Sequence, residues 1–167
     1  MKVQNPWFTQ REIQRCFGAW AKALNEKDLA TFIKDCPNAD GQTVAIIAAG
    51  NIPLVSFHDI LTVLLCGANL KIKLSSDDKV LSKAVIELLQ SMVPDFSGRV
   101  EIVERVSPKL VHGLIATGSN NTARYFEYYF RELPKVLRKN RTSVAVLSGE
   151  ESKEDMQALA TDIYAYF

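Results

Sequence analysis

The sequence predicts an α/β protein, in which helices cover both faces of a mainly parallel sheet of five strands. Short apolar runs rich in β-branched residues, typical of buried parallel strands, alternate with segments of helical periodicity. The connections between these segments are short. Strand–helix–strand units with short connections form right-handed crossovers within one parallel sheet, which gives three layers, α/β/α.

The first part of the chain, residues 1–40, is expected to form a helical segment that packs on the sheet domain. Apolar residues recur at helical spacing over residues 9–24, and Thr9 with Glu12 fits a capping box. A second, short helix through residues 29–33 is expected to stop before Pro37.

The sheet domain itself is expected over residues 41–167. The predicted strands are 43–50, 69–76, 99–104, 110–118 and 141–149, and the helices between them include residues 54–64, 80–92 and 121–133. Ser76 and the two aspartates after it suit the start of the helix at 80–92. A last helix keeps its periodicity up to Phe167 without a closing glycine, asparagine or proline, which predicts a domain truncated within or just after that helix.

Composition excludes several classes of function. Twenty basic and 19 acidic residues give a net charge of +1, too weak a field to favour nucleic acid or an anionic membrane. No apolar stretch reaches the roughly 18 residues that cross a bilayer, and no secretory signal opens the chain, so we expect a cytoplasmic protein without a membrane span. His58 and His112 lack partners at metal-ligand spacing, and no metal site is expected.

Three cysteines, Cys16, Cys36 and Cys66, stand far apart in apolar surroundings. Their odd number and wide spacing argue against a zinc site. We expect reduced, buried thiols.

The stretch ATGSNNTARYF (116–126) lies at the end of a predicted strand, where an open parallel sheet binds its ligands. Gly118 would let the backbone turn and approach a ligand. The hydroxyl of Ser119 and the neighbouring N–H groups could bind a phosphate or a ribose. The alternative is a turn that only caps the helix after it.

Two more candidates follow neighbouring predicted strands. Asn51 comes one residue after Gly50, and its amide could stabilise a developing oxyanion, an effect of about 3 kcal/mol where such donors have been removed. Its alternative role is a helix N-cap. Lys73, near the end of the second strand, could meet a cofactor's ribose or phosphate.

The strings AGNIPL, KLSSDD, GSNNTARYFEYYF and RKNRTSVAVL resemble the acyl-CoA reductases of the LuxC type, a branch of the aldehyde dehydrogenase superfamily. The resemblance runs from about residue 5 to the end of the chain. It implies the Rossmann-like cofactor domain of that superfamily and the reduction of a fatty acyl-CoA to an aldehyde by NADPH, through an acyl-enzyme on a cysteine. Acyl-CoA would then be the substrate, and a homo-oligomer would be compatible with the family.

Residue by residue, the resemblance implies that Asn51 is the oxyanion asparagine and that Lys73 contacts the adenosine ribose or its phosphate. Gly118 and Ser119 would face the cofactor's pyrophosphate and nicotinamide end. Ser75 and Thr117, beside these positions, are assigned to the same NADPH site.

The chain departs from the family pattern in two places. The ELGGK segment, with its water-activating glutamate, corresponds to LRKNR (137–141), so the hydrolytic base is missing, which suits a reductase. The family's cysteine nucleophile lies in a GLGCRN-like motif that this sequence does not contain, and none of its three cysteines matches it. We therefore expect this chain alone to be inactive. The alternative from another class is a non-catalytic nucleotide-binding or interaction module.

Overall fold

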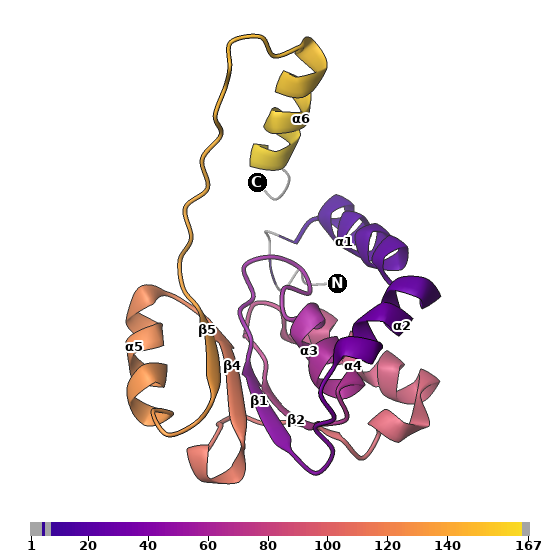
Figure 1. Ribbon diagram of the computed structural model, residues 1–167, viewed down its shortest axis with the longest axis vertical. Helices are drawn as coiled ribbons and strands as arrows, with labels where there is room; N and C mark the ends of the chain where they lie inside the picture. The colour runs from indigo at the N-terminus through magenta and orange to yellow at the C-terminus, as the bar shows by residue number, and fades with distance from the viewer. Residues whose placement is uncertain (1–4, 6–7, 165–167) are drawn as a thin grey trace.

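The computed structural model describes Asn5 and residues 8–164, which build a five-stranded sheet with helices on both sides (Figure 1). All neighbouring strands run parallel, in the order β3–β2–β1–β4–β5. The strands are β1 Thr43–Ile47, β2 Asn69–Lys73, β3 Val100–Ile102, β4 Gly113–Thr117 and β5 Lys135–Arg138. The predicted fold class is confirmed.

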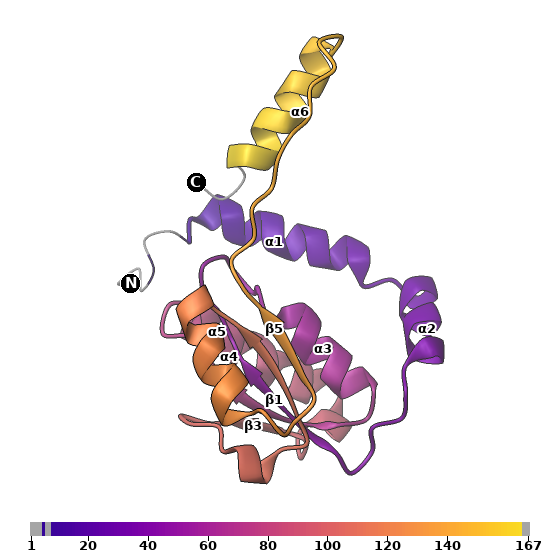
Figure 2. The same ribbon diagram turned by 60° about the vertical axis from the view of Figure 1, so that its left-hand side comes forward.

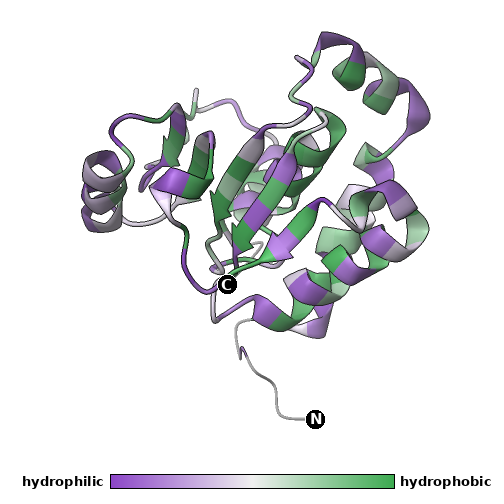
Figure 3. Cartoon of the chain, turned by 90° about the horizontal axis from the view of Figure 1, so that it is seen from below, coloured by the Kyte–Doolittle hydropathy of each residue, from purple (hydrophilic) through white to green (hydrophobic). Residues whose placement is uncertain are grey.

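Helices α3 (Phe57–Leu65) and α4 (Lys79–Met92) lie on one face of the sheet, and α5 (Asn120–Tyr129) lies on the other. The sheet has one hydrophobic core on each face, and neighbouring residues of β1 point into different cores. Ile46 packs with α3, whereas Ala45 packs with β4 and with Phe130, the C-cap of α5. In Figure 3 the strands carry hydrophobic bands, which in β2 alternate with hydrophilic ones. The crossover from β3 to β4 contains only the 3-10 helix η2 (Pro108–Leu110), and η1 (Pro94–Phe96) follows α4.

The N-terminal helical segment consists of α1 (Gln10–Ala23) and α2 (Glu26–Asp35). The predicted capping box is confirmed, because the Thr9 hydroxyl accepts from the Glu12 N–H and the Glu12 carboxylate accepts from the Thr9 N–H. Cys16 of α1 packs against α3 and α4, whereas no residue of α2 is buried. The first helix is therefore anchored to the domain more firmly than the second.

The prediction of a fifth strand at residues 141–149 is wrong. β5 is formed by residues 135–138, and β4 pairs with it from Leu114↔Lys135 to Thr117↔Arg138. Helix α5 also ends earlier than the predicted residue 133. The Lys135 ammonium donates to the carbonyl oxygens of Phe130, Arg131 and Leu133 just past the helix end, and the backbone of residues 135–138 pairs with β4.

Residues 139–152 instead form an extended connection that leads away from the sheet to α6 (Lys153–Tyr164) (Figure 2). Every residue from 139 to 150 is exposed, and α6 buries none of its residues. The sheet and the helices that cover it are therefore built by residues 43–138, a shorter range than the predicted 41–167. Phe167, up to which the last helix was predicted to run, lies outside the described residues. Within the described part of the chain, no helix combines the length and apolar character needed to cross a membrane.

Candidate functional site

The loops that carry the predicted site residues leave the same edge of the sheet. In the parallel register, Ile47 of β1 lies beside Lys73 of β2 on one side and Ala116 of β4 on the other. Residues 48–56, 74–78 and 118–119 follow these three strand ends, and we call these loops the carboxyl rim. The chain runs from β1 outward to β2 and β3 and later returns to β4 on the other side of β1. The rim loops after β1 and β4 therefore flank the point where the strand order reverses, which is where open α/β sheets bind ligands.

The β1 loop and the β2 loop are in direct contact at Gly50. A Cβ atom on Gly50 would lie 2.5 Å from Oγ and 2.8 Å from Cβ of Ser75. Only a residue without a side chain fits there. The glycine thus brings the loop of Asn51 against the loop that carries Ser75.

Asn51 is exposed on this loop, and its side-chain amide has no hydrogen-bond partner among the described residues. The N-cap role is excluded because α3 begins at Phe57 and its N-cap position is Ser56. The amide of Asn51 is therefore free to donate to a ligand.

Two buried side chains hold the turn that follows Asn51. The Cys16 thiol of α1 donates to the carbonyl oxygen of Pro53 at 3.2 Å, and the Leu54 N–H donates to Oδ2 of Asp78 at 3.0 Å. Leu54 has a φ of +54°, a backbone conformation that residues other than glycine adopt at a cost in free energy. The surrounding contacts keep the turn in this conformation.

Asp78 has a different role from the one expected. Although it occupies the N-cap position of α4, its carboxylate caps no helix N–H. Its Oδ2 accepts from Leu54 and from the Ser82 hydroxyl at 2.8 Å, and its buried Oδ1 has no partner among the described residues. Burial raises the pKa of Asp78 despite these two hydrogen bonds. Burial and the nearby Asp78 carboxylate also raise the pKa of Cys16, which stays a thiol.

Lys73 and Ser75 lie at the β2 end of the carboxyl rim. Lys73 is exposed and has no carboxylate partner among the described residues, whereas Lys71, two residues before it, pairs with Glu101 at 2.6 Å. Ser75 is half-buried, and its hydroxyl accepts from the Asp77 N–H at 3.3 Å. The β2 end therefore offers one cation that is free to meet an anionic ligand.

Thr117, Gly118 and Ser119 lead from β4 into α5. Ser119 is the N-cap of α5, since its hydroxyl oxygen accepts from the Thr122 N–H at 3.2 Å. Gly118 does not adopt a left-handed conformation; a Cβ there would come within 3.3 Å of the Thr122 side chain. The capping interpretation of this turn is thus confirmed. A ligand role would fall to the remaining N–H groups of the α5 N-terminus, which attract anions.

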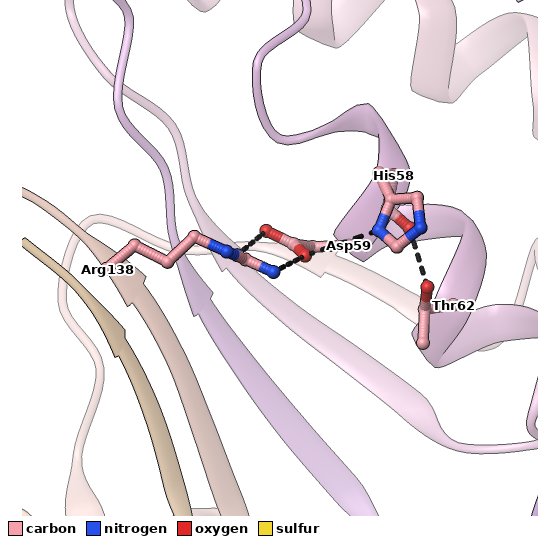
Figure 4. A network of polar contacts seen from close by, with 4 residues as sticks. All are labelled: His58, Asp59, Thr62 and Arg138. Carbon is pink, nitrogen blue, oxygen red and sulfur yellow. Dashed lines mark hydrogen bonds and ion pairs between the residues drawn. The ribbon is translucent and has the colours of Figure 1, made fainter. Parts of the chain in front are cut away.

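An ion pair that the sequence did not predict joins the edge strand β5 to helix α3 near the carboxyl rim (Figure 4). Arg138, the last residue of β5, donates two hydrogen bonds to Asp59 in the first turn of α3, at 2.6 and 2.8 Å. The Asp59 side chain is 6% exposed and that of Arg138 is 33% exposed. The basic run of residues 138–141 therefore begins with a largely buried arginine. His58 lies 3.8 Å from the same carboxylate but is itself exposed.

Among the aromatic residues of α5 and its C-cap, Phe126 and Phe130 pack against the sheet, while Tyr125, Tyr128 and Tyr129 are more than 60% exposed. No group of three or more metal-ligating side chains occurs among the described residues. Of the three cysteines expected to be buried, all are free thiols, but Cys36 and Cys66 are only half-buried.

Searches against protein-family models, curated proteins and solved structures returned no match to this chain.

Gly50, Asp78 and the Asp59–Arg138 pair are the site residues that sequence reasoning missed. The small residues of AAGN (48–51) were a usable signal for Gly50, because a glycine at a strand end often marks a close approach of two backbones. Leu54, which donates to Asp78, lies 24 residues away from it in sequence, and Asp59 lies 79 residues away from Arg138. No local pattern announces such contacts.

Proposed function

We propose that this chain binds NADPH at the carboxyl rim and is the cofactor-binding part of an acyl-CoA reductase of the LuxC type. The observation that supports this most is the register that brings the ends of β1, β2 and β4 side by side where the strand order reverses. The resemblance of the loop sequences to that family supplies the choice of cofactor and reaction.

The chemistry of the rim residues fits a dinucleotide. The exposed ammonium of Lys73 and the N–H groups at the α5 N-terminus are positive groups on either side of β1, suited to phosphates. Gly50 allows close packing of the two loops between them. NADPH, when bound, would supply the hydride for reduction.

In the proposed enzyme, the chain's own residues bind and polarise. Lys73, with Ser75 beside it, would hold the adenosine ribose or its phosphate. Thr117, Gly118 and Ser119 would border the pyrophosphate and nicotinamide end. Asn51 would donate its amide N–H to the oxyanion that forms when the acyl carbonyl is attacked.

None of the cysteines in this chain is suited to be the nucleophile. Cys16 is 6% exposed, and its pKa is raised by burial and by Asp78. Cys36 and Cys66 follow the C-terminal ends of α2 and α3, near the start of β1 and therefore at the edge of the sheet opposite the rim. We accordingly expect no aldehyde when the chain alone is mixed with an acyl-CoA and NADPH.

Calorimetric titration with NADPH, NADH, FMN and CoA tests the proposal. We expect NADPH to bind and Lys73→Ala to weaken its binding about tenfold, the loss of one charge-assisted hydrogen bond. Lys71→Ala removes the same charge from the same strand away from the rim and should leave the affinity unchanged. Tight binding of FMN without any binding of NADPH would overturn the proposal.

A further inference from the structure

At the edge of the sheet opposite the rim, the turn after α2 packs directly against the end of α3. The Ala39 N–H donates to the carbonyl oxygen of Cys66 at 2.7 Å. Gly67 has a φ of +90°, and a Cβ there would lie 3.3 Å from Oδ1 of Asn38 and 3.4 Å from the backbone nitrogen of Asp40. Residues 38–40, directly after Cys36 and Pro37, and residues 66–67 therefore form one tightly packed contact between segments distant in sequence.

The contact brings two cysteines together. Cys36 is the C-cap of α2 and Cys66 is the C-cap of α3. Both are half-buried free thiols. Burial, followed by a hydrogen bond with the Cys36 thiol, raises the pKa of Cys66 to about 11, so Cys66 stays protonated at neutral pH.

We propose that Cys36 and Cys66 are a redox modification site, which hydrogen peroxide converts to a disulfide that ties α2 to α3. One of the two thiols attacks the peroxide, whose O–O bond breaks, and becomes a sulfenic acid as one molecule of water leaves. The other thiol then attacks the sulfur of that sulfenic acid, loses its proton and releases a second water as the S–S bond forms. Two thiols lose two electrons, and one peroxide is reduced to two waters.

The same disulfide forms whichever of the two thiols attacks the peroxide first. Cys16 does not take part. It is 6% exposed and its thiol is hydrogen-bonded to Pro53 in a different part of the molecule.

The disulfide would fix a helix that is otherwise weakly held. No residue of α2 is buried, and an apolar cavity of about 220 Å³ separates Leu29 and Phe32 of α2 from Leu61 and Leu65 of α3. Closing the chain between residues 36 and 66 also restricts the unfolded state. The expected result is a rise in Tm of about 10 °C.

The test is to expose the full chain to excess hydrogen peroxide, block the remaining thiols, and combine intact mass, peptide mapping and calorimetry. We expect a monomer that has lost two hydrogens, one Cys36–Cys66 linked peptide, an unmodified Cys16, and the rise in Tm, all reversed by dithiothreitol. Cys36→Ser and Cys66→Ser should each abolish the rise, and Cys16→Ser should retain it.

The proposal is overturned if the wild-type chain keeps all three thiols, or if oxidation yields only linkages between chains or sulfinic acids. Peptide mapping of the wild-type chain gives this answer even where a serine variant folds poorly. The outcome is independent of cofactor binding, so it is distinguishable from a failure of the proposed function.

Discussion

In the β1–β2 half of the carboxyl rim, contacts between residues distant in sequence hold the loops. The β4–β5 half is held by local contacts, apart from the Arg138–Asp59 pair that joins it to the first half. Gly50 packs on Ser75, and Asp78 binds the backbone of Leu54. Across β1, Ser119 caps its own helix, and the chain after β5 leaves the sheet with Val144 and Val146 84% and 91% exposed. The β1–β2 half of the rim is therefore preorganised by tertiary packing. The β4–β5 half depends on the start of α5, and the chain beyond β5 is open to solvent.

The largest effect is expected where the two halves are joined. Arg138→Ala should lower the free energy of unfolding by about 3 kcal/mol, because it leaves the buried carboxylate of Asp59 without a counter-charge. This is the lower end of the range for buried pairs, since a third of the arginine side chain is exposed. Denaturant unfolding measures it. Arg138→Lys, which keeps the charge but loses the paired geometry, should lose less, and a loss below 1 kcal/mol in the alanine variant would show that the pair is not desolvated.

A smaller effect is expected at the contact within the preorganised half. Gly50→Ala should destabilise the protein by about 2 kcal/mol, because its Cβ overlaps the Ser75 side chain. Ser75→Gly in the same chain removes both overlapping atoms and should restore much of the loss. Thermal unfolding of the two variants decides the matter. If the second substitution restores nothing, the two loops are not packed as described.

Two substitutions of Asp78 distinguish the contribution of its hydrogen bonds to stability from that of its charge. Asp78→Ala should cost about 1 to 2 kcal/mol, because Leu54 N–H loses its buried acceptor. Asp78→Asn keeps an acceptor without the buried charge and should be close to neutral or stabilising at pH 7. Denaturant unfolding at a series of pH values compares the variants.

The pH dependence of the same residue has a defined sign. Because the folded pKa of Asp78 is raised above its ordinary 3.8, the unfolded state releases the proton first as pH rises. The wild-type chain should therefore lose stability relative to Asp78→Asn between pH 3.8 and the raised pKa, and stay lower above it. A difference that grows in the opposite direction would mean that the carboxylate is stabilised in the folded state.

The smallest effect is expected in the open half. Val144→Thr with Val146→Thr should change the free energy of unfolding by less than about 0.5 kcal/mol, since both side chains are exposed. Calorimetry measures this. The control is Val85→Thr, at a buried position of α4, which should clearly destabilise the protein. An equal loss in both would show that residues 141–149 are packed.

The sequence was sufficient for what depends on local pattern. The parallel α/β class, the capping box of Thr9 and the first four strands followed from periodicity and apolar runs, with boundaries shifted by a few residues. It was insufficient where tertiary contacts compete. The alternating valines of residues 141–149 predict a strand better than the basic KVLR of β5. In the structure, however, the Lys135 ammonium binds the carbonyl of Phe130 just past α5, and residues 135–138 pair with β4.

The candidate site divides in the same way. That the ends of β1, β2 and β4 share one edge follows from a parallel sheet and was predictable. The hydrogen bond of Asp78 with Leu54, the partner of Arg138 and the meeting of Cys36 with Cys66 depend on folding of the whole chain and have no local signature.

Amide NMR spectra of the chain during titration with NADPH test the central claim most directly. We expect the resonances of Gly50, Asn51, Ser75, Gly118 and Ser119 to shift together and saturate at one concentration, while those of Gly67 and Gly113 at the opposite edge stay fixed. Shifts at the opposite edge with an unchanged rim would contradict it.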